Sequence, residues 1–159
     1  MSRVARSARV ASRQRPETLG LNTVEGIDKT ITEAETGKLF FIDHNHASTL
    51  TITLPPAQEG AYFRFQFVRH LTANGKVEIV KPASMANGTI KGTITGLVYT
   101  TAFGDANAGT KKDAGSATKV ELIDDIHVGS YVECYSDGTN WQFNGVIIAD
   151  ALGAGSFDA

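Results

Sequence analysis

Alternating polar and apolar residues recur in short runs from residue 28 onward, and glycine, proline or Asp-Gly turns separate the runs. The clearest run is Tyr62–Val68, in which Phe63, Phe65 and Phe67 share one face while polar side chains occupy the other. A period of two residues is that of a β-strand with one buried face. The pattern therefore predicts a strand whose three phenylalanines lie in the core.

Further strands are predicted where the same alternation or a short apolar run stands between turn residues. These segments are Asp28–Glu35, Lys38–Asp43, Thr49–Leu54, Lys76–Val80, Ile90–Tyr99, Lys119–Ile123, Ser130–Tyr135 and Asn140–Ile148. Residues 101–117, mainly Gly, Ala, Asp, Lys and Thr, are expected to form a long exposed loop. Many short strands with frequent turns are typical of an all-β sandwich or barrel. We expect a single antiparallel β-sandwich or barrel-like domain over residues 28–159.

A tight hairpin is predicted near the C-terminus, where Asp137 and Gly138 stand between two strand patterns. Glycine takes the positive φ that such turns require at no steric cost. Trp141 follows the turn. Its ring could serve as a platform for a sugar, but we favour a structural role in which it closes one end of the core.

The first fifteen residues follow a different pattern, with no acid and almost only Ser, Ala and Val between five arginines: Arg3, Arg6, Arg9, Arg13 and Arg15. Such a segment has too little apolar surface to offset the entropy lost on ordering, so in isolation it is expected to be disordered. The spacing would place the first four arginines on one helical face, and Pro16 would end that helix. An extended strand remains an equal alternative. We assign residues 1–27 to a docking arm and linker.

Charge is distributed unevenly along the 159 residues. The formal net charge is −2, yet residues 1–16 carry five positive charges and no negative ones, which leaves ten Lys and Arg against seventeen Asp and Glu in the remainder. A basic arm on an acidic body indicates docking onto an acidic partner. A protein surface is favoured, because guanidinium groups bind carboxylates in pairs of hydrogen bonds. Nucleic acid is the less favoured partner, since the body repels phosphates and the arm has no aromatic residue for base stacking.

The histidines do not form a recognisable metal-binding motif. His44 and His46 are two residues apart and could face one way on a strand, but the sequence supplies no third and fourth ligand, and neither His70 nor His127 brings a matching pair. A polar turn between two strands is the favoured interpretation. We expect no bound metal and no cofactor.

Catalytic motifs are also missing. Asp124 and Asp125 followed by His127 are the best acid–base candidates, but a solvated turn explains them equally well. The single cysteine, Cys134, excludes an internal disulfide and is expected to pack as a small apolar residue. No run approaches the ~18 apolar residues of a membrane span, and no apolar signal region follows the basic N-terminus. We expect a non-enzymatic protein made in the cytoplasm and used without export.

Two regions resemble structural modules of tailed-bacteriophage virions. One is Gly129–Trp141, with its Ser-Asp-Gly-Thr-Asn-Trp turn, and the other runs from Leu50–Ala57 through Gly60 to the aromatic strand Tyr62–Val68. The resemblance extends over about residues 48–68 and 118–148, roughly a third of the chain. The resemblance implies a β-rich virion protein and is compatible with capsid decoration proteins, tail fibres and other virion parts.

Size, arm and charge favour one role among these. A single domain with a docking arm is similar to a capsid decoration (cement) protein, often a homotrimer, whose arms bind the major capsid protein on the outer surface of the head. Contact with a membrane is not expected, because no long apolar run is present, and contact with nucleic acid is unexpected, because the body is acidic. The alternative is a tail-fibre or receptor- or glycan-binding virion protein, for which Trp141 or Tyr99 would be the binding aromatic residue.

Overall fold

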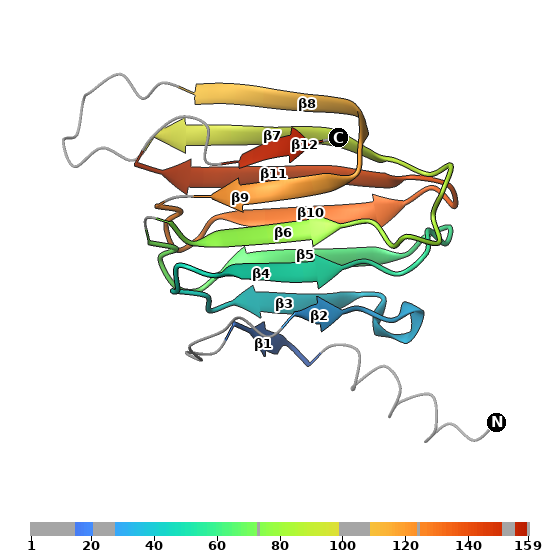
Figure 1. The fold of residues 1–159 in the computed structure, drawn as a ribbon, viewed down its shortest axis with the longest axis horizontal. Coiled ribbons are helices and arrows are strands. Elements are labelled where there is room, and N and C mark those ends of the chain that lie inside the picture. Colours follow the sequence, from blue (N-terminus) through green and yellow to red (C-terminus); the bar gives the residue numbers. More distant parts are fainter. Residues whose placement is uncertain are drawn as a thin grey trace.

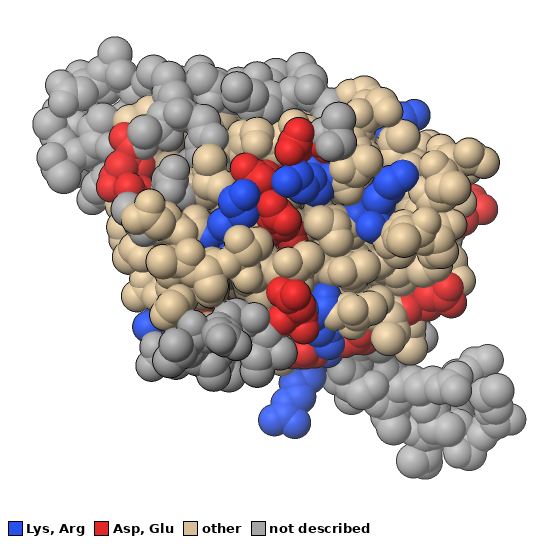
Figure 2. Space-filling view, in the orientation of Figure 1, with Lys and Arg blue, Asp and Glu red and all other residues tan. Residues whose placement is uncertain are grey.

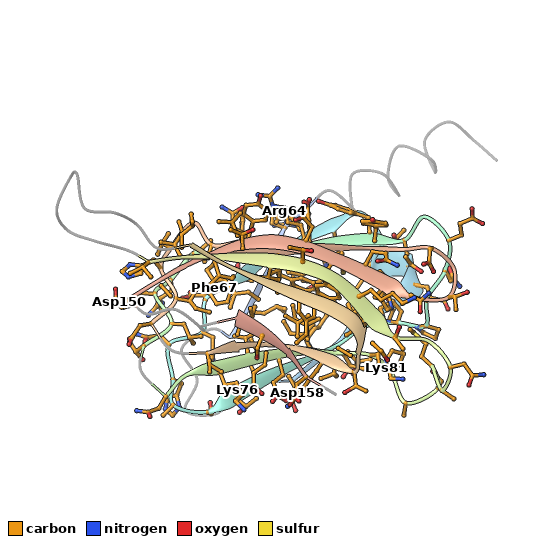
Figure 3. All side chains as sticks on the ribbon, turned by 90° about the horizontal axis from the view of Figure 1, so that it is seen from above. Arg64, Phe67, Lys76, Lys81, Asp150 and Asp158 are labelled. Carbon is orange, nitrogen blue, oxygen red and sulfur yellow. The ribbon has the colours of Figure 1, made fainter. Side chains whose placement is uncertain are left out.

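The structure is a computed structural model that describes residues 15–20, 28–72, 74–98, 109–123, 125–150 and 155–158, with the backbone alone over 109–114. Two β-sheets lie one over the other (Figure 1, Figure 3). One has seven strands in the order β1-β3-β5-β10-β11-β7-β8, and the other has five in the order β12-β9-β6-β4-β2. The all-β, sandwich-like class is thus confirmed.

The strands and the one short 3-10 helix have the following bounds. They are β1 Glu17–Leu19, β2 Lys29–Thr30, η1 Glu33–Glu35, β3 Lys38–Ile42, β4 Thr49–Thr53, β5 Tyr62–Phe67, β6 Lys76–Val80, β7 Ile90–Val98, β8 Gly109–Ala117, β9 Lys119–Ile123, β10 Tyr131–Ser136, β11 Trp141–Ala149 and β12 Gly155–Asp158. Among the described residues no helix has the length and apolar character needed to cross a membrane.

The first six strands alternate between the two sheets, so that strands two apart in sequence become neighbours. β1, β3 and β5 pair in parallel in one sheet, and β2, β4 and β6 pair in parallel in the other. Both sheets are therefore mixed, whereas the sequence was expected to form an antiparallel sandwich. The reason is physical: alternation of apolar residues determines which face of a strand is buried, but not which strand lies beside it.

In the second half of the chain most neighbouring strands pair antiparallel, whereas β7 and β11 pair in parallel. β7 pairs with β8 and β10 with β11 in the larger sheet, while β9 lies between β6 and β12 in the smaller one. The expected loop at 101–117 is wrong for residues 109–117, which form the edge strand β8. Backbone pairing with β7 suffices for an edge strand, and it does not require the apolar alternation that sequence analysis detects.

The predicted core residues lie between the sheets. Phe63, Phe65 and Phe67 are fully buried, and Phe65 stacks on Phe40 with ring centroids 5.4 Å apart. Trp141 is 0% exposed, packs against Phe63, and donates its indole N–H to the Pro55 carbonyl at 3.2 Å. These observations confirm the aromatic strand and the structural role of Trp141. Truncating any of these rings to alanine is expected to cost about 3–5 kcal/mol.

Candidate functional site at the root of the N-terminal arm

The structure describes the point at which the arginine arm joins the body. Arg3, Arg6, Arg9 and Arg13 lie outside the described residues, whereas Arg15 is described and exposed. We call Arg15–Gly20 the arm root. It contains β1, although the sequence analysis assigned all of residues 1–27 to arm and linker. Three residues, of which only Leu19 is a large apolar side chain, are too short a run to show a strand period.

β1 is the edge strand of the seven-stranded sheet and pairs in parallel with β3, with Glu17 opposite Phe40 and Leu19 opposite Ile42. The Leu19 side chain is 6% exposed and belongs to the core, and its carbonyl accepts a hydrogen bond from the Asp43 N–H at 2.8 Å. Gly20 follows with φ +83°, and a Cβ there would lie 2.9 Å from the His44 Cβ. Only glycine allows the chain to pass His44 this closely.

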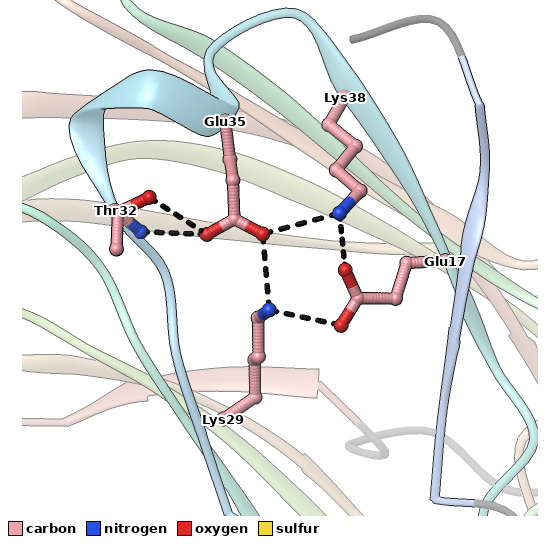
Figure 4. Close-up of polar contacts among 5 residues, drawn as sticks. All are labelled: Glu17, Lys29, Thr32, Glu35 and Lys38. Atoms are coloured by element: carbon pink, nitrogen blue, oxygen red, sulfur yellow. Dashed lines mark hydrogen bonds and ion pairs between the residues drawn. The ribbon is translucent and has the colours of Figure 1, made fainter. Parts of the chain in front are cut away.

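Four charged residues, which we call the root network, attach β1 to its surroundings: Glu17, Lys29, Glu35 and Lys38 (Figure 4). The Lys29 ammonium donates to Glu17 at 2.9 Å and to Glu35 at 3.0 Å. The Lys38 ammonium donates to Glu35 at 3.1 Å and also to Glu17. Each lysine therefore bridges both carboxylates. Because Lys29 lies in β2 and Lys38 in β3, the network joins the two sheets at the edge where the arm begins.

Glu35 is the most strongly held member of the root network. One carboxylate oxygen accepts hydrogen bonds from the Thr32 N–H at 2.8 Å and the Thr32 hydroxyl at 3.1 Å, and the other accepts from both lysines. Burial raises the pKa of Glu35, but these hydrogen bonds outweigh it and lower the pKa from 4.5 to about 2. Burial opposes ionisation of Glu17 too, and its two lysine partners still lower its pKa. Both carboxylates are thus ionised at neutral pH.

The root network also rests on the aromatic core. The Lys29 and Lys38 ammonium groups lie 5.8 and 5.2 Å from the centroid of the fully buried Phe40 ring, close enough for cation–π attraction. All four side chains of the network are between 15% and 32% exposed. Partial burial reduces solvent screening, so each contact contributes more than an exposed surface pair would.

A second set of charges, which we call the outer network, lies on the outer face of the five-stranded sheet. It comprises Lys76 and Glu78 in β6, Lys119 and Glu121 in β9, and Asp158 in β12. Figure 2 shows these blue and red side chains gathered over β6 and β9. Lys119 contacts three carboxylates at 3.0–3.3 Å, and hydrogen bonds from Glu78, Glu121 and Asp158 raise the pKa of this lysine.

The predicted C-terminal hairpin is confirmed between β10 and β11. One Asp137 carboxylate oxygen accepts from the N–H groups of Thr139 at 2.9 Å and Asn140 at 2.7 Å, and these hydrogen bonds lower its pKa. Gly138 has φ +91°, as the turn requires. Asp137 and Gly138 therefore act within the turn. Trp141 presents no exposed face to a ligand, and Tyr99 lies outside the described residues.

The two histidines of the 43–46 segment do not come together as a pair. His44 is buried, with its Nε2 2.8 Å from the Ser48 carbonyl oxygen, whereas His46 is exposed. The segment connects β3 and β4, as the polar-turn interpretation predicted. Cys134 is fully buried, as expected, and burial raises the pKa of its thiol.

The structure instead brings together His70, His127 and Asp150, which we call the histidine cluster. Their potential ligand atoms lie within 4.8 Å of one another. The two imidazole rings stack with centroids 4.6 Å apart, and Asp125 approaches the His70 Nε2 at 4.0 Å. Sequence analysis considered Asp125 together with His127 as acid–base candidates but missed their association with His70 and Asp150, because three distant segments supply the cluster. Asp124 lies outside the described residues.

Comparisons of the chain with models of protein families, with curated proteins and with solved structures find no match.

Proposed function

We propose that this chain is a structural protein of a tailed-bacteriophage virion, and specifically a capsid decoration protein. It binds the outer capsid shell through its N-terminal arm and stabilises the assembled head. Two observations support the assignment to a virion: the hairpin sequence around Asp137–Trp141 and the segment from Leu50 through Tyr62–Val68, which resemble phage structural modules. The decoration role is inferred from the single β body and the charge of the arm.

The observation that carries the proposal is the construction of the arm root. An arm that transmits force between proteins must be fixed to a folded body, because a loose linker would extend under load. Here the arm leaves from β1, whose Leu19 lies in the core and whose Glu17 is held by Lys29 and Lys38. Force on residues 1–14 would pass through these contacts into both sheets.

Docking combines charge pairing with backbone pairing. Ordering each residue of the arm costs about 1–2 kcal/mol, which arginine–carboxylate contacts alone do not offset. β1 is an edge strand, so an arm that continues from it can add as a strand to an edge of the shell protein. In a trimer, three such arms acting together raise the effective concentration at neighbouring sites. Three arms that each bind weakly then attach the whole trimer stably to the shell.

Deletion of residues 1–14 tests this proposal. The deletion removes four of the five arm arginines but keeps Arg15, β1 and the root network. Purified protein is mixed with phage heads assembled without it, and binding is measured by co-sedimentation. The deletion variant should fold with an unchanged Tm and fail to bind. A matched control, Arg64→Gln, removes a partly exposed arginine from β5 and should bind as the wild type does.

Binding by the deletion variant at the wild-type level would reject the proposed arm function. A genome-contacting role would be favoured instead by two results together. The wild type would not bind heads, and the DNA affinity of the deletion variant would depend less steeply on salt concentration than that of the wild type.

A further inference from the structure

We propose that the histidine cluster is a binding site for a divalent transition-metal ion of the zinc type. His70, His127 and Asp150 supply the ligands, and Asp125 supplies a further carboxylate beside them. This site is separate from the arm root and independent of the proposed virion role.

Backbone pairing builds the cluster. Isolated antiparallel bridges join Leu71 to Ile126 and Ile126 to Ala149, so three segments lie side by side at the end of β11. The Leu71 N–H donates to the Ile126 carbonyl at 2.9 Å, and the His127 N–H donates to the Ile148 carbonyl at 2.8 Å. The cluster is thus attached to a hydrogen-bonded framework and not to a free loop.

The alternation of side chains then places the polar groups together. Leu71, Ile126 and Ala149, the residues at the bridges, are buried in the core. Their sequence neighbours point the opposite way, because successive residues of an extended chain face opposite sides. The antiparallel register sets His70 across from His127 and Asp125 across from Asp150. Figure 3 shows Asp150 at one end of the sandwich, at the same end as Phe67, the last residue of β5.

The donor atoms suit a zinc-type ion. Two imidazoles with one or two carboxylates are preferred by Zn²⁺ and its neighbours, whereas Mg²⁺ and Ca²⁺ prefer oxygen alone. In a tetrahedral site with bonds of about 2.0–2.1 Å, ligand atoms lie roughly 3.3 Å apart. The three atoms here lie within 4.8 Å, and the Asp150 carboxylate is already 2.6 Å from the His127 Nε2. Small side-chain rotations would therefore bring the donors to bonding distance.

One atom of the cluster points to a missing partner. The His70 Nε2 is covered from solvent and has no hydrogen-bond partner, although the His70 side chain as a whole is 41% exposed. The nearest opposite charge, the Asp125 carboxylate, is too distant at 4.0 Å for a hydrogen bond. Buried polar atoms without partners are rare, and a ligand explains this one. A cation between His70, His127 and Asp150 would satisfy it.

The test uses the full chain without an affinity tag, stripped of metal with a chelator. Zn²⁺ binding is measured by calorimetry, and Co²⁺ binding by the visible absorption of the bound ion. We expect one ion per chain and a rise in Tm on adding Zn²⁺, since an ion that binds only the folded state stabilises it. His70→Ala and His127→Ala should each weaken Zn²⁺ binding at least tenfold. The matched control is His46→Ala, which removes an exposed histidine outside the cluster.

Asp150→Asn keeps the test decisive if a histidine variant fails to fold, because the Asp150 side chain is 52% exposed and its replacement leaves the core intact. This variant should also lose at least tenfold in Zn²⁺ affinity. The proposal is overturned if the wild type binds no stoichiometric Zn²⁺. It is equally overturned if folded His70→Ala or Asp150→Asn proteins bind as the wild type does, or if His46→Ala abolishes binding.

Discussion

The root network and the outer network use the same chemistry, lysines shared between carboxylates, but they hold very different parts of the chain. The outer network links β6, β9 and β12, which are already neighbours in one sheet and share ladders of backbone hydrogen bonds. The root network joins the short helix η1 to β1 and β3 of one sheet and to β2 of the other. Its β1 is three residues long and has one neighbour among the described strands.

This difference shows that the count of ion pairs is a poor guide to their importance. Surface pairs contribute about 0–1 kcal/mol when the backbone stays in place without them. The side chains of the outer network lie on strands whose backbones are already paired in this way. In the root network the side chains, together with Leu19, support a short edge strand whose backbone pairs with β3 at three residues. We therefore expect similar substitutions in the two networks to have unequal effects. Hydrogen exchange of the Asp43 N–H, which donates to the Leu19 carbonyl, reports the release of β1.

The largest effects should come from the apolar residue beneath each network. Leu122→Ala in β9 leaves a cavity in the core and should lower the free energy of unfolding by about 2–5 kcal/mol, measured by chemical denaturation. Leu19→Ala should release β1 locally. Hydrogen exchange of the Asp43 N–H should then accelerate at least tenfold. The free energy of unfolding should fall less than it does for Leu122→Ala. Equal loss of global stability in the two variants would show that β1 unfolds only with the whole domain.

The next largest effect is expected for Glu35→Gln. Lowering the Glu35 pKa from 4.5 to about 2 corresponds to roughly 3 kcal/mol, and solvent screening at this partly open site reduces the contribution to about 1–2 kcal/mol. Exchange of the Asp43 N–H should accelerate about tenfold. The matched variant Glu121→Gln in the outer network should change stability by less than about 0.5 kcal/mol and leave Asp43 unaffected. Equal effects of the two variants would remove the distinction between the networks.

Acid should release β1 in the wild type. The Glu35 pKa is lower in the folded state than in the unfolded state, so its contribution is fully present above pH 4.5 and is lost as pH falls toward 2. Glu17, whose pKa is also lowered, adds to the same trend. The protection factor of the Asp43 N–H should fall across this window, measured by NMR. Glu35→Gln should make this protection factor depend less on pH. An unchanged pH dependence would show that another group controls the release of β1.

The smallest effect is expected for Lys119→Met, although this lysine contacts three carboxylates. β9 remains paired with β6 on one side and β12 on the other without it. The Tm should shift by less than about 2 °C, and raising the salt concentration to about 1 M should leave the wild-type Tm nearly unchanged. A larger fall in Tm than that of Glu35→Gln would reverse our ranking of the networks.

The sequence allowed the buried side of each strand to be predicted better than the neighbours of each strand. Phe63, Phe65 and Phe67 are all in the core because a period of two is a local property. The parallel pairing within β1 to β6 arises because the chain passes from one sheet to the other after each strand. The alternation of apolar residues does not encode these connections. β8 was missed because backbone pairing with β7 replaces the apolar pattern that sequence analysis requires.

The candidate sites were predictable to different degrees. Asp137 and Gly138 act in the turn that the sequence indicated, because turn chemistry is local. The root network combines residues 17, 29, 35 and 38, and the histidine cluster combines residues 70, 127 and 150. Neither follows a spacing motif, since both arise where separate strands meet. Once the register is known, the buried residues Leu71 and Ile126 locate the outward-facing histidines beside them.

The central claim, that a rooted arm attaches this body to a capsid shell, is tested most directly by the position of the protein in the virion. Cryo-electron microscopy of whole phage particles would locate it. The account predicts the β-sandwich on the outer surface of the head, with density for residues 1–14 running from the edge strand β1 onto the major capsid protein. A body found on the tail or inside the head, or attached through a surface other than the arm, would contradict it.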